Sequence, residues 1–193
     1  MKWILFGVRL GAAIIWVGSA LGQSTVAPKH VADPAHLLPR DPSAAERVET
    51  TLTAFERSSG LRVLVQLQVN SPTAEQDKVP GAFMHRLAES LGVAQRGVLV
   101  VYFAEEDDWR IWFGDETASA FVGRPGTARE LTENGAIHEA KEAFLTACAA
   151  QAKAEVAALN SKPGVDPRDI TAQRIRANAT AIVDGLIEKL RPK

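Results

Sequence analysis

Cysteine is almost absent from this 193-residue chain, which removes one source of stability. With Cys148 alone, no disulfide bond can form within the chain, so packing must hold the fold together. Cys148 lies in an alanine-rich helical pattern beside Phe144 and Ala147, and this setting favours a small buried residue over a reactive nucleophile.

The chain also lacks an excess of positive or negative charge. The chain has 22 Lys and Arg residues against 23 Asp and Glu residues, for a formal net charge of -1. These charges are spread along the chain rather than gathered into blocks. The sequence therefore has no basic footprint for nucleic acid, and we expect no nucleic-acid partner.

Complete catalytic motifs are also missing. No G-x-S-x-G turn is present, which disfavours a serine hydrolase, and the glycines mark turns and helix ends rather than a phosphate-binding loop. The histidines show no metal-ligand pairing at helical spacing, so we expect these four at the surface: His30, His36, His85 and His138.

A long apolar run is present only at the N-terminus, over residues 3–21. It has the layout of a secretory signal, and small residues near its end suit cleavage before Gln23. The alternative is an uncleaved membrane anchor, because an apolar run of about 20 residues can span a bilayer. Arg9 and three glycines within the run favour cleavage. We therefore expect residues 1–22 to be a signal peptide and the mature chain to be periplasmic or otherwise extracytoplasmic, with membrane contact only if the segment is retained.

The mature chain is predicted to start with an extended lead-in, residues 23–42, whose prolines disfavour helix. Ser43 and Glu46 have the spacing of a capping box, so a helix is predicted to begin at Ser43. Ser59-Gly60 is predicted to end it, since glycine readily takes the left-handed conformation that follows a helix.

Two predicted strands flank a second helix. Residues 61–69 alternate along one face, and residues 98–103 are continuously apolar, as in a strand that is covered on both faces. Between them the apolar spacing predicts a helix that ends at Gly92. Because strand, helix and strand follow in that order, the two strands should be parallel.

The most informative segment is GVLVVYFAEEDDWRIWFG, residues 97–114. It reads as the buried strand, an acidic turn over residues 105–108 and a third strand over residues 109–113. Such a tight turn reverses the chain, so the third strand should be antiparallel to the second and the sheet should be mixed. Trp109 and Trp112 are an odd number of residues apart, so they should project to opposite faces of the sheet.

The chain is predicted to be helical from residue 127 onward. Thr127 and Glu130 form a second capping-box pattern, and Asn134-Gly135 interrupts the short helix. A long alanine-rich helix over about 137–159 is predicted to bury a stripe made of Ile137, Ala140, Phe144, Ala147, Gln151 and Ala154. In the last helix, Asp166 and Pro167 form the start, and the predicted core stripe is Ile175, Ala179, Ile182, Val183, Leu186 and Leu190.

Several short sequence motifs follow one another along the chain in a characteristic order. They are Val31-Ala32-Asp33, a helix with Val48, Leu52 and Phe55 that leads through Ser59-Gly60 into Val63-Leu64-Val65, then Gly97-Val98-Leu99-Val100-Val101, and Arg110-Ile111-Trp112-Phe113-Gly114. Over about residues 31–126 this order resembles the TPM domain family, exported or membrane-tethered domains of bacterial envelopes, of thylakoid repair factors and of an animal receptor modulator.

The resemblance implies an α/β fold: a three-layer α/β/α sandwich with a small mixed sheet and a helical C-terminal extension. Residues 43–126 would be the TPM-like core, and residues 127–193 would be helices packing on it. Some members of the family are reported to have acid phosphatase activity, and acidic loop residues hold calcium or another divalent cation.

The first functional hypothesis follows from those acidic residues. Ligands of open α/β sheets bind at the carboxyl ends of strands, where the acidic turn lies, and hard cations take about six to eight oxygen ligands. The candidate metal ligands are Asp33, Glu105, Asp107 and Asp108. The ion of a metal-dependent phosphatase would polarise a phosphoryl oxygen and activate water. The alternatives are a solvated hairpin tip and, for Asp33, a turn role before Pro34.

The second hypothesis is a protein-interaction module. Trp109, Arg110 and Trp112 on an edge strand, next to an acidic tip, are typical of a partner-binding surface, although both tryptophans could instead pack beneath helices. The TPM family has Asp or Asn before the glycine of its central strand, whereas this chain has Gln95-Arg96. We therefore favour a periplasmic interaction or envelope-maintenance module without its own catalysis, bound to an envelope protein, over a phosphatase.

Overall fold

The computed structural model describes residues 29–160 and 166–191, so the predicted signal peptide and the first residues of the lead-in lie outside the described residues. A four-stranded sheet forms the centre, in the order β1 (Val31–Ala32), β2 (Arg62–Gln68), β3 (Gly97–Phe103) and β4 (Asp108–Phe113). β1, β2 and β3 are parallel, and β4 is antiparallel to β3. The predicted mixed sheet is confirmed, and β1 adds a strand from within the lead-in.

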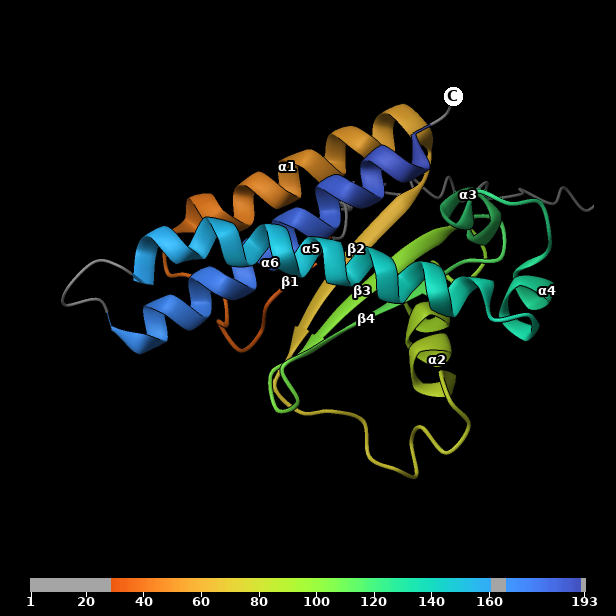
Figure 1. The fold of residues 1–193 in the computed structure, drawn as a ribbon, viewed down its shortest axis with the longest axis horizontal. Helices are drawn as coiled ribbons and strands as arrows, with labels where there is room; N and C mark the ends of the chain where they lie inside the picture. Colours follow the sequence, from red (N-terminus) through yellow and green to blue (C-terminus); the bar gives the residue numbers. More distant parts are fainter. Residues whose placement is uncertain (1–28, 161–165, 192–193) are drawn as a thin grey trace, which may run out of the picture.

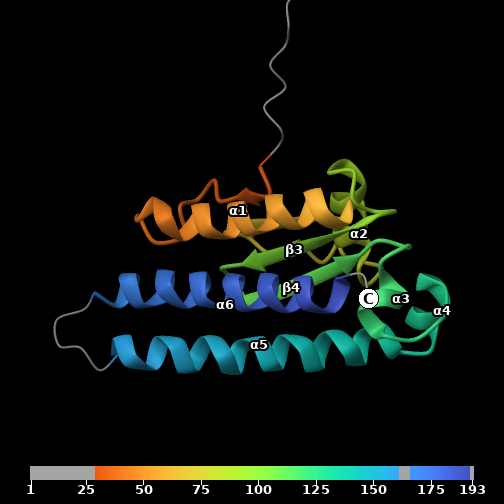
Figure 2. The same ribbon diagram turned by 90° about the horizontal axis from the view of Figure 1, so that it is seen from above.

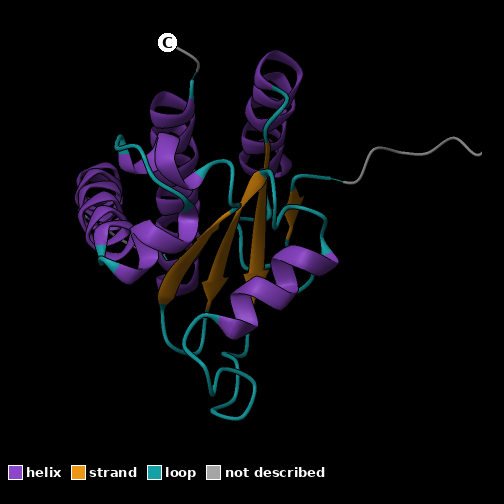
Figure 3. Cartoon of the chain, turned by 90° about the vertical axis from the view of Figure 1, so that its right-hand side faces the viewer, coloured by secondary structure: helices purple, strands orange, loops and turns teal. Residues whose placement is uncertain are grey.

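Helices cover both faces of this sheet (Figure 1). They are α1 (Pro42–Ser59), α2 (Ala82–Ser90), α3 (Ala118–Val122), α4 (Ala128–Glu133), α5 (Ala136–Asn160) and α6 (Pro167–Leu190). α1 and α6 pack on one face, and α5 lies beside α6 as a C-terminal helical pair (Figure 2). α2 covers the other face, so the chain has an α/β fold with flanking helices (Figure 3).

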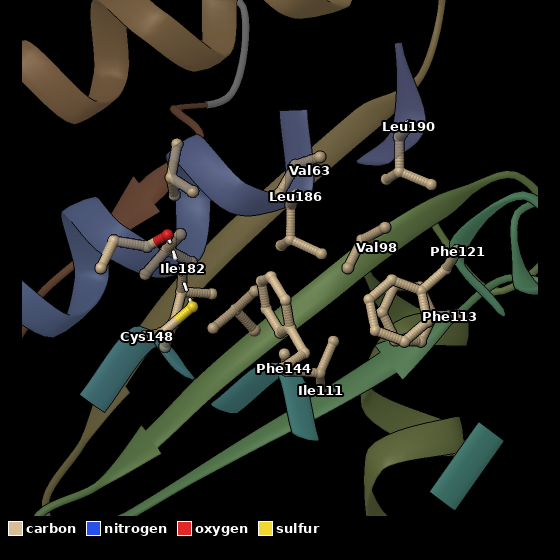
Figure 4. Packing of buried hydrophobic residues seen from close by; sticks show 14 of the residues in the cluster. Val63, Val98, Ile111, Phe113, Phe121, Phe144, Cys148, Ile182, Leu186 and Leu190 are labelled. Atoms are coloured by element: carbon tan, nitrogen blue, oxygen red, sulfur yellow. Dashed lines mark hydrogen bonds between the residues drawn. The ribbon is translucent and has the colours of Figure 1, made fainter. Parts of the chain in front are cut away.

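Two apolar cores fill the spaces on either side of the sheet. The larger lies under α1, α5 and α6, where Val98 and Ile111 of the sheet meet Leu186 of α6 (Figure 4). The smaller lies under α2, where Met84 packs over Leu99. Nearly all of β3 is buried in these two cores, because both of its faces are covered.

The first helix begins earlier than its sequence pattern predicts. Asp41 is the N-cap, and its carboxylate accepts a hydrogen bond from Ser43 N, while Pro42 occupies the first turn. The prediction that Ser43 caps the helix is therefore wrong. Aspartate is as good an N-cap as serine, and proline is pre-organised for the first helical position, so the Asp41-Pro42 pair prevails. The end at Gly60, with φ of 67°, is confirmed.

The buried stripe of α5 differs from the predicted one beyond Phe144. Cys148, Ala152 and Val156 are buried at four-residue spacing, whereas Ala147, Gln151 and Ala154 of the predicted stripe are exposed. Alanine occurs on every side of this helix, so the apolar pattern does not define one face. The burial of Cys148 itself is confirmed, and burial raises the pKa of its thiol to about 11.

The predicted features of the other C-terminal helices are confirmed. Thr127 and Glu130 form a capping box at α4, and Asp166 caps α6 with Pro167 in its first turn. All six residues of the predicted core stripe of α6 are buried. α3 was not predicted, because a five-residue helix contains too few turns for an apolar period to show.

The lead-in is fastened to α1 through His30. This side chain is only 5% exposed, so the prediction of a surface position is wrong for it. Its ring nitrogens lie 2.9 Å from Glu49 Oε1 and 2.7 Å from Glu56 Oε2. Glu49 also accepts hydrogen bonds from the backbone N–H groups of His30 and Val31. Burial alone would raise the pKa of the Glu49 carboxyl, but these hydrogen bonds outweigh it and lower the pKa.

None of the described helices is both long and apolar enough to cross a bilayer. That result concerns residues 29–160 and 166–191, and the predicted signal peptide is not among them.

Candidate functional site

The acidic turn lies where it was predicted, between β3 and β4 at the carboxyl end of β3. Glu105, Glu106 and Asp107 are exposed, and Asp108 is half-buried at the start of β4. Their carboxylates do not converge on one point: Glu105 accepts from Ser71 N, Asp107 pairs with Arg174, and Glu106 and Asp108 both pair with Arg110.

Asp107 joins the hairpin to the last helix. Its Oδ1 accepts a hydrogen bond of 2.8 Å from the Tyr102 hydroxyl, and its Oδ2 lies 2.5 Å from Arg174 Nη1 of α6. The backbone of Asp107 is left-handed, with φ of 53°, a conformation that aspartate tolerates better than most residues. Burial alone would raise the pKa of this carboxyl, but the bonds from Arg174 and Tyr102 outweigh it and lower the pKa.

Arg110 gathers three other carboxylates on the opposite side of the hairpin. Its guanidinium lies 2.6 Å from Glu106, 2.9 Å from Asp108 and 3.6 Å from Asp77 of the β2–α2 loop. It also lies over the Phe103 ring, 4.9 Å from the centroid. A guanidinium that is held by three anions and an aromatic face has few alternative positions, so this side chain is fixed before any partner arrives.

Glu105 ties the hairpin to the loop that follows β2. Its Oε2 accepts a hydrogen bond from Ser71 N, and its backbone N–H donates to Val69 O. In the same loop Val69 and Val79 are the large apolar side chains exposed among the described residues. The loop therefore presents the apolar side chain of Val69 next to the acidic turn.

Asp33, the fourth predicted metal ligand, has a turn role instead. Its two carboxylate oxygens accept hydrogen bonds from Leu37 N at 2.8 Å and Leu38 N at 2.9 Å. This is the turn role that the sequence left as an alternative. Within residues 29–160 and 166–191, no three His, Cys, Asp or Glu side chains gather as ligands of one metal ion.

The acidic residues do not direct their carboxylates at one common point. A calcium ion needs several oxygens directed at one point, whereas these carboxylates already accept from guanidinium, phenol or peptide donors. The assignment of a divalent cation to Asp33, Glu105, Asp107 and Asp108 stays a prediction that the geometry does not support.

Trp109 and Trp112 lie on opposite faces of β4, as predicted. Trp109 packs against the larger core with its ring 4.9 Å from that of Tyr102, and Trp112 packs against the smaller core with its ring 5.0 Å from His85. Both are half-buried, which agrees with the alternative that the two tryptophans pack beneath covering elements. The reason is that helices or loops cover both faces of this edge strand.

Two shallow hollows of about 330 and 290 Å³ lie along the seam between α1 and α6. The first is lined by side chains such as Asp184 and Arg191, and the second by Arg47 and Arg176. Neither hollow includes a residue that the sequence predicted as a metal ligand or as part of the partner-binding surface. A small-molecule site usually encloses most of its ligand, whereas these two hollows are shallow and open to solvent.

No protein-family model matches the chain, and no curated protein matches it significantly. The resemblance to the TPM domain family therefore depends on the short phrases of the sequence alone, and it stays a prediction. The structure itself establishes an α/β fold with a four-stranded mixed sheet, flanking helices and a C-terminal helical pair.

The alkaline titration of Tyr102 reports directly on the state of the hairpin. Burial, the hydrogen bond to the Asp107 carboxylate and the negative charge of that carboxylate together raise the pKa of this phenol to about 12. In Asp107→Asn the charge is removed while the burial remains. We therefore expect the pKa of Tyr102 to fall below that of the native protein and to stay above 10.0, the ordinary value of a tyrosine.

The measurement is the ultraviolet absorbance of the phenolate, which is unambiguous because the chain has a single tyrosine. Glu106→Gln is the matched control, since Glu106 pairs with Arg110 and not with Tyr102. An unchanged titration midpoint in Asp107→Asn would contradict the contact.

Proposed function

We propose that this chain is an exported TPM-like module that binds a protein of the cell envelope through the β3–β4 hairpin and strand β4, without catalysis of its own. The proposal combines the predicted signal peptide with the resemblance to the TPM domain family. The α/β fold with a mixed sheet is consistent with it at the coarse level.

The observation that carries the proposal is the fixed arrangement of Trp109, Arg110 and Trp112 on the edge strand β4. Each tryptophan packs at a tilt against a neighbouring ring, and the arginine is held by three carboxylates. Tryptophan and arginine provide much of the binding energy at protein interfaces. Because these side chains are already ordered, little conformational entropy is lost when a partner binds.

The alternative, a metal-dependent acid phosphatase, has no comparable support. It would need a cation among carboxylates that now pair with Arg110, Arg174, Tyr102 and backbone amides. It would also need a position from which water could attack a phosphoryl group. It therefore stays an implication of the resemblance.

The test is photo-crosslinking in the living source cell. A photoreactive amino acid at Glu105, on the exposed hairpin, is expected to give a discrete adduct in the extracytoplasmic fraction. The same amino acid at Lys153, an exposed position on α5, is the matched control and should give none.

An adduct from both positions, or from neither, would contradict the proposed binding surface. Recovery of the unmodified protein only from the cytoplasmic fraction would contradict export.

A further inference from the structure

We propose that the envelope partner binds by adding an extended strand to the outer edge of β4, and that the added segment carries basic residues at both ends. This inference rests on the proposed function and specifies how the partner is held. It follows from the backbone register of β4, from the cover on each sheet edge and from the charges at the two ends of β4.

The register decides which peptide groups of β4 point away from the sheet. Gly114 N donates to Gly97 O, so Gly114 and Gly97 form a hydrogen-bonded pair of the antiparallel ladder. Hydrogen-bonded and non-hydrogen-bonded pairs alternate along such a ladder. In this register Trp109, Ile111 and Phe113 stand at the non-hydrogen-bonded positions, so their N–H and C=O groups point outward.

The outward carbonyl of Ile111 has one partner, the ammonium group of Lys141 on α5, at a long distance of 3.4 Å. Within the described part of the chain, the outward N–H groups of Trp109, Ile111 and Phe113 donate to no acceptor. Burial lowers the pKa of Lys141, and the negative charge of Glu142 offsets only part of that effect. A single lysine is a weak cover for six residues of strand.

The other edge of the sheet is covered far more completely. β1 is two residues long, and the outward N–H of Val31 donates to Glu49 Oε2 at 2.9 Å. The Glu49 carboxylate also holds His30 from α1. Short edge strands and covering side chains prevent strand pairing, so β4 is the edge at which a strand can be added.

Acidic residues frame both ends of the β4 edge. At the hairpin end five carboxylates, those of residues 105–108 and Asp77, stand against two guanidiniums, Arg110 and Arg174. At the other end Asp115 and Glu116 are exposed and take part in none of the recorded ion pairs of the described residues. A strand with basic residues at its two ends complements these charges.

The same charges disfavour a second copy of this chain as the occupant. If two copies paired antiparallel about Ile111, Asp107 of one copy would approach Asp115 of the other, and Glu106 would approach Glu116. Like charges directly opposite each other destabilise a strand pair. The occupant is therefore a segment of a different protein, with an apolar or β-branched centre between basic ends.

Backbone amide hydrogen exchange of the native protein provides the test. In the free protein the amides of Trp109, Ile111 and Phe113 are expected to exchange faster than those of Arg110 and Trp112, which face β3. We then expect a peptide with a Val-Thr-Val-Thr-Val centre and two lysines at each end to slow the exchange of the first three amides.

Two control peptides make this result specific. Glutamates in place of the four lysines should weaken binding about tenfold at low ionic strength. N-methylation of alternate peptide groups in the centre removes the ladder donors and should abolish the protection. Absence of protection at millimolar lysine-ended peptide, or equal binding of the lysine-ended and glutamate-ended peptides, would overturn the inference.

Variants of the protein should shift the affinity in opposite directions. Asp115→Lys combined with Glu116→Lys should weaken binding of the lysine-ended peptide about tenfold. Its matched control is Glu46→Lys combined with Asp169→Lys, an equal charge change at exposed helix positions away from β4, which should leave binding unchanged. Lys141→Met frees the Ile111 carbonyl and should tighten binding about fivefold.

Crosslinking separates this inference from the proposed function. An adduct from Glu105 without any protection of the β4 amides would leave the proposed function standing and overturn strand addition. The absence of both an adduct and any protection would overturn the two together.

Discussion

Replacement of Phe121 by alanine is expected to lower the free energy of unfolding by about 4 kcal/mol, the range found when a buried phenylalanine is truncated. Phe121 is 1% exposed, and its ring stacks on Phe113 at 3.9 Å and meets Phe144 edge-on at 5.5 Å. Figure 4 shows these three rings together at the end of β4. Truncation would leave a cavity between the sheet and the helical pair.

Urea denaturation at neutral pH measures this loss. Phe121→Leu keeps most of the volume and should lose about 1.5 kcal/mol. Ala120→Gly, at an exposed position of the same helix, should lose about 1 kcal/mol and reports the cost of disturbing α3 alone. If Phe121→Ala lost no more than Ala120→Gly, the ring cluster would not stabilise the end of β4.

The second large effect is expected at Gly114, where Gly114→Ala should lower the free energy of unfolding by about 3 kcal/mol. An added Cβ would lie 2.7 Å from Gln95 O and 2.8 Å from Gln95 C. Both are backbone atoms, so they cannot move aside as a flexible side chain could. The strain would fall on the segment that joins α2 to β3.

Gly92→Ala is the matched control, because its cost would come from the backbone conformation and not from a steric clash. Gly92 has a left-handed backbone, with φ of 72°, but no atom lies within 4 Å of the added Cβ. It should lose only about 1 kcal/mol, for the left-handed conformation. Denaturant melts of the two variants compare steric with conformational cost, and equal losses would contradict the close approach at Gly114.

The central part of the fold could be predicted from local sequence patterns. Strands β2, β3 and β4 show in the alternation of residues 61–69 and in the apolar run before the acidic turn, because strand period and turn chemistry are properties of neighbouring residues. The core stripe of α6 could be predicted too, since large apolar side chains mark one face. α5 lacks such contrast, so its stripe was misplaced after Phe144.

The candidate site shows what a local pattern omits. Four successive carboxylates suggested a cation, but Arg174, which neutralises Asp107, lies 67 residues further along the chain. Nothing in the sequence near Asp107 predicts that pairing. The same holds for His30, whose partners Glu49 and Glu56 are 19 and 26 residues away. Lys141, which reaches the β4 edge from α5, was also missed, because an isolated lysine in a helix is ordinarily solvated.

The bond between Arg174 and Asp107 has a consequence for synthesis. A growing chain can complete its sheet and the acidic turn well before α6 leaves the ribosome. Until then the turn carries a carboxylate without its cation, in a backbone conformation that costs energy to maintain. Truncated products that end before Arg174 would therefore have strand β4 but would lack the cation that pairs with Asp107, so the tip of the hairpin is completed only when α6 packs onto the sheet.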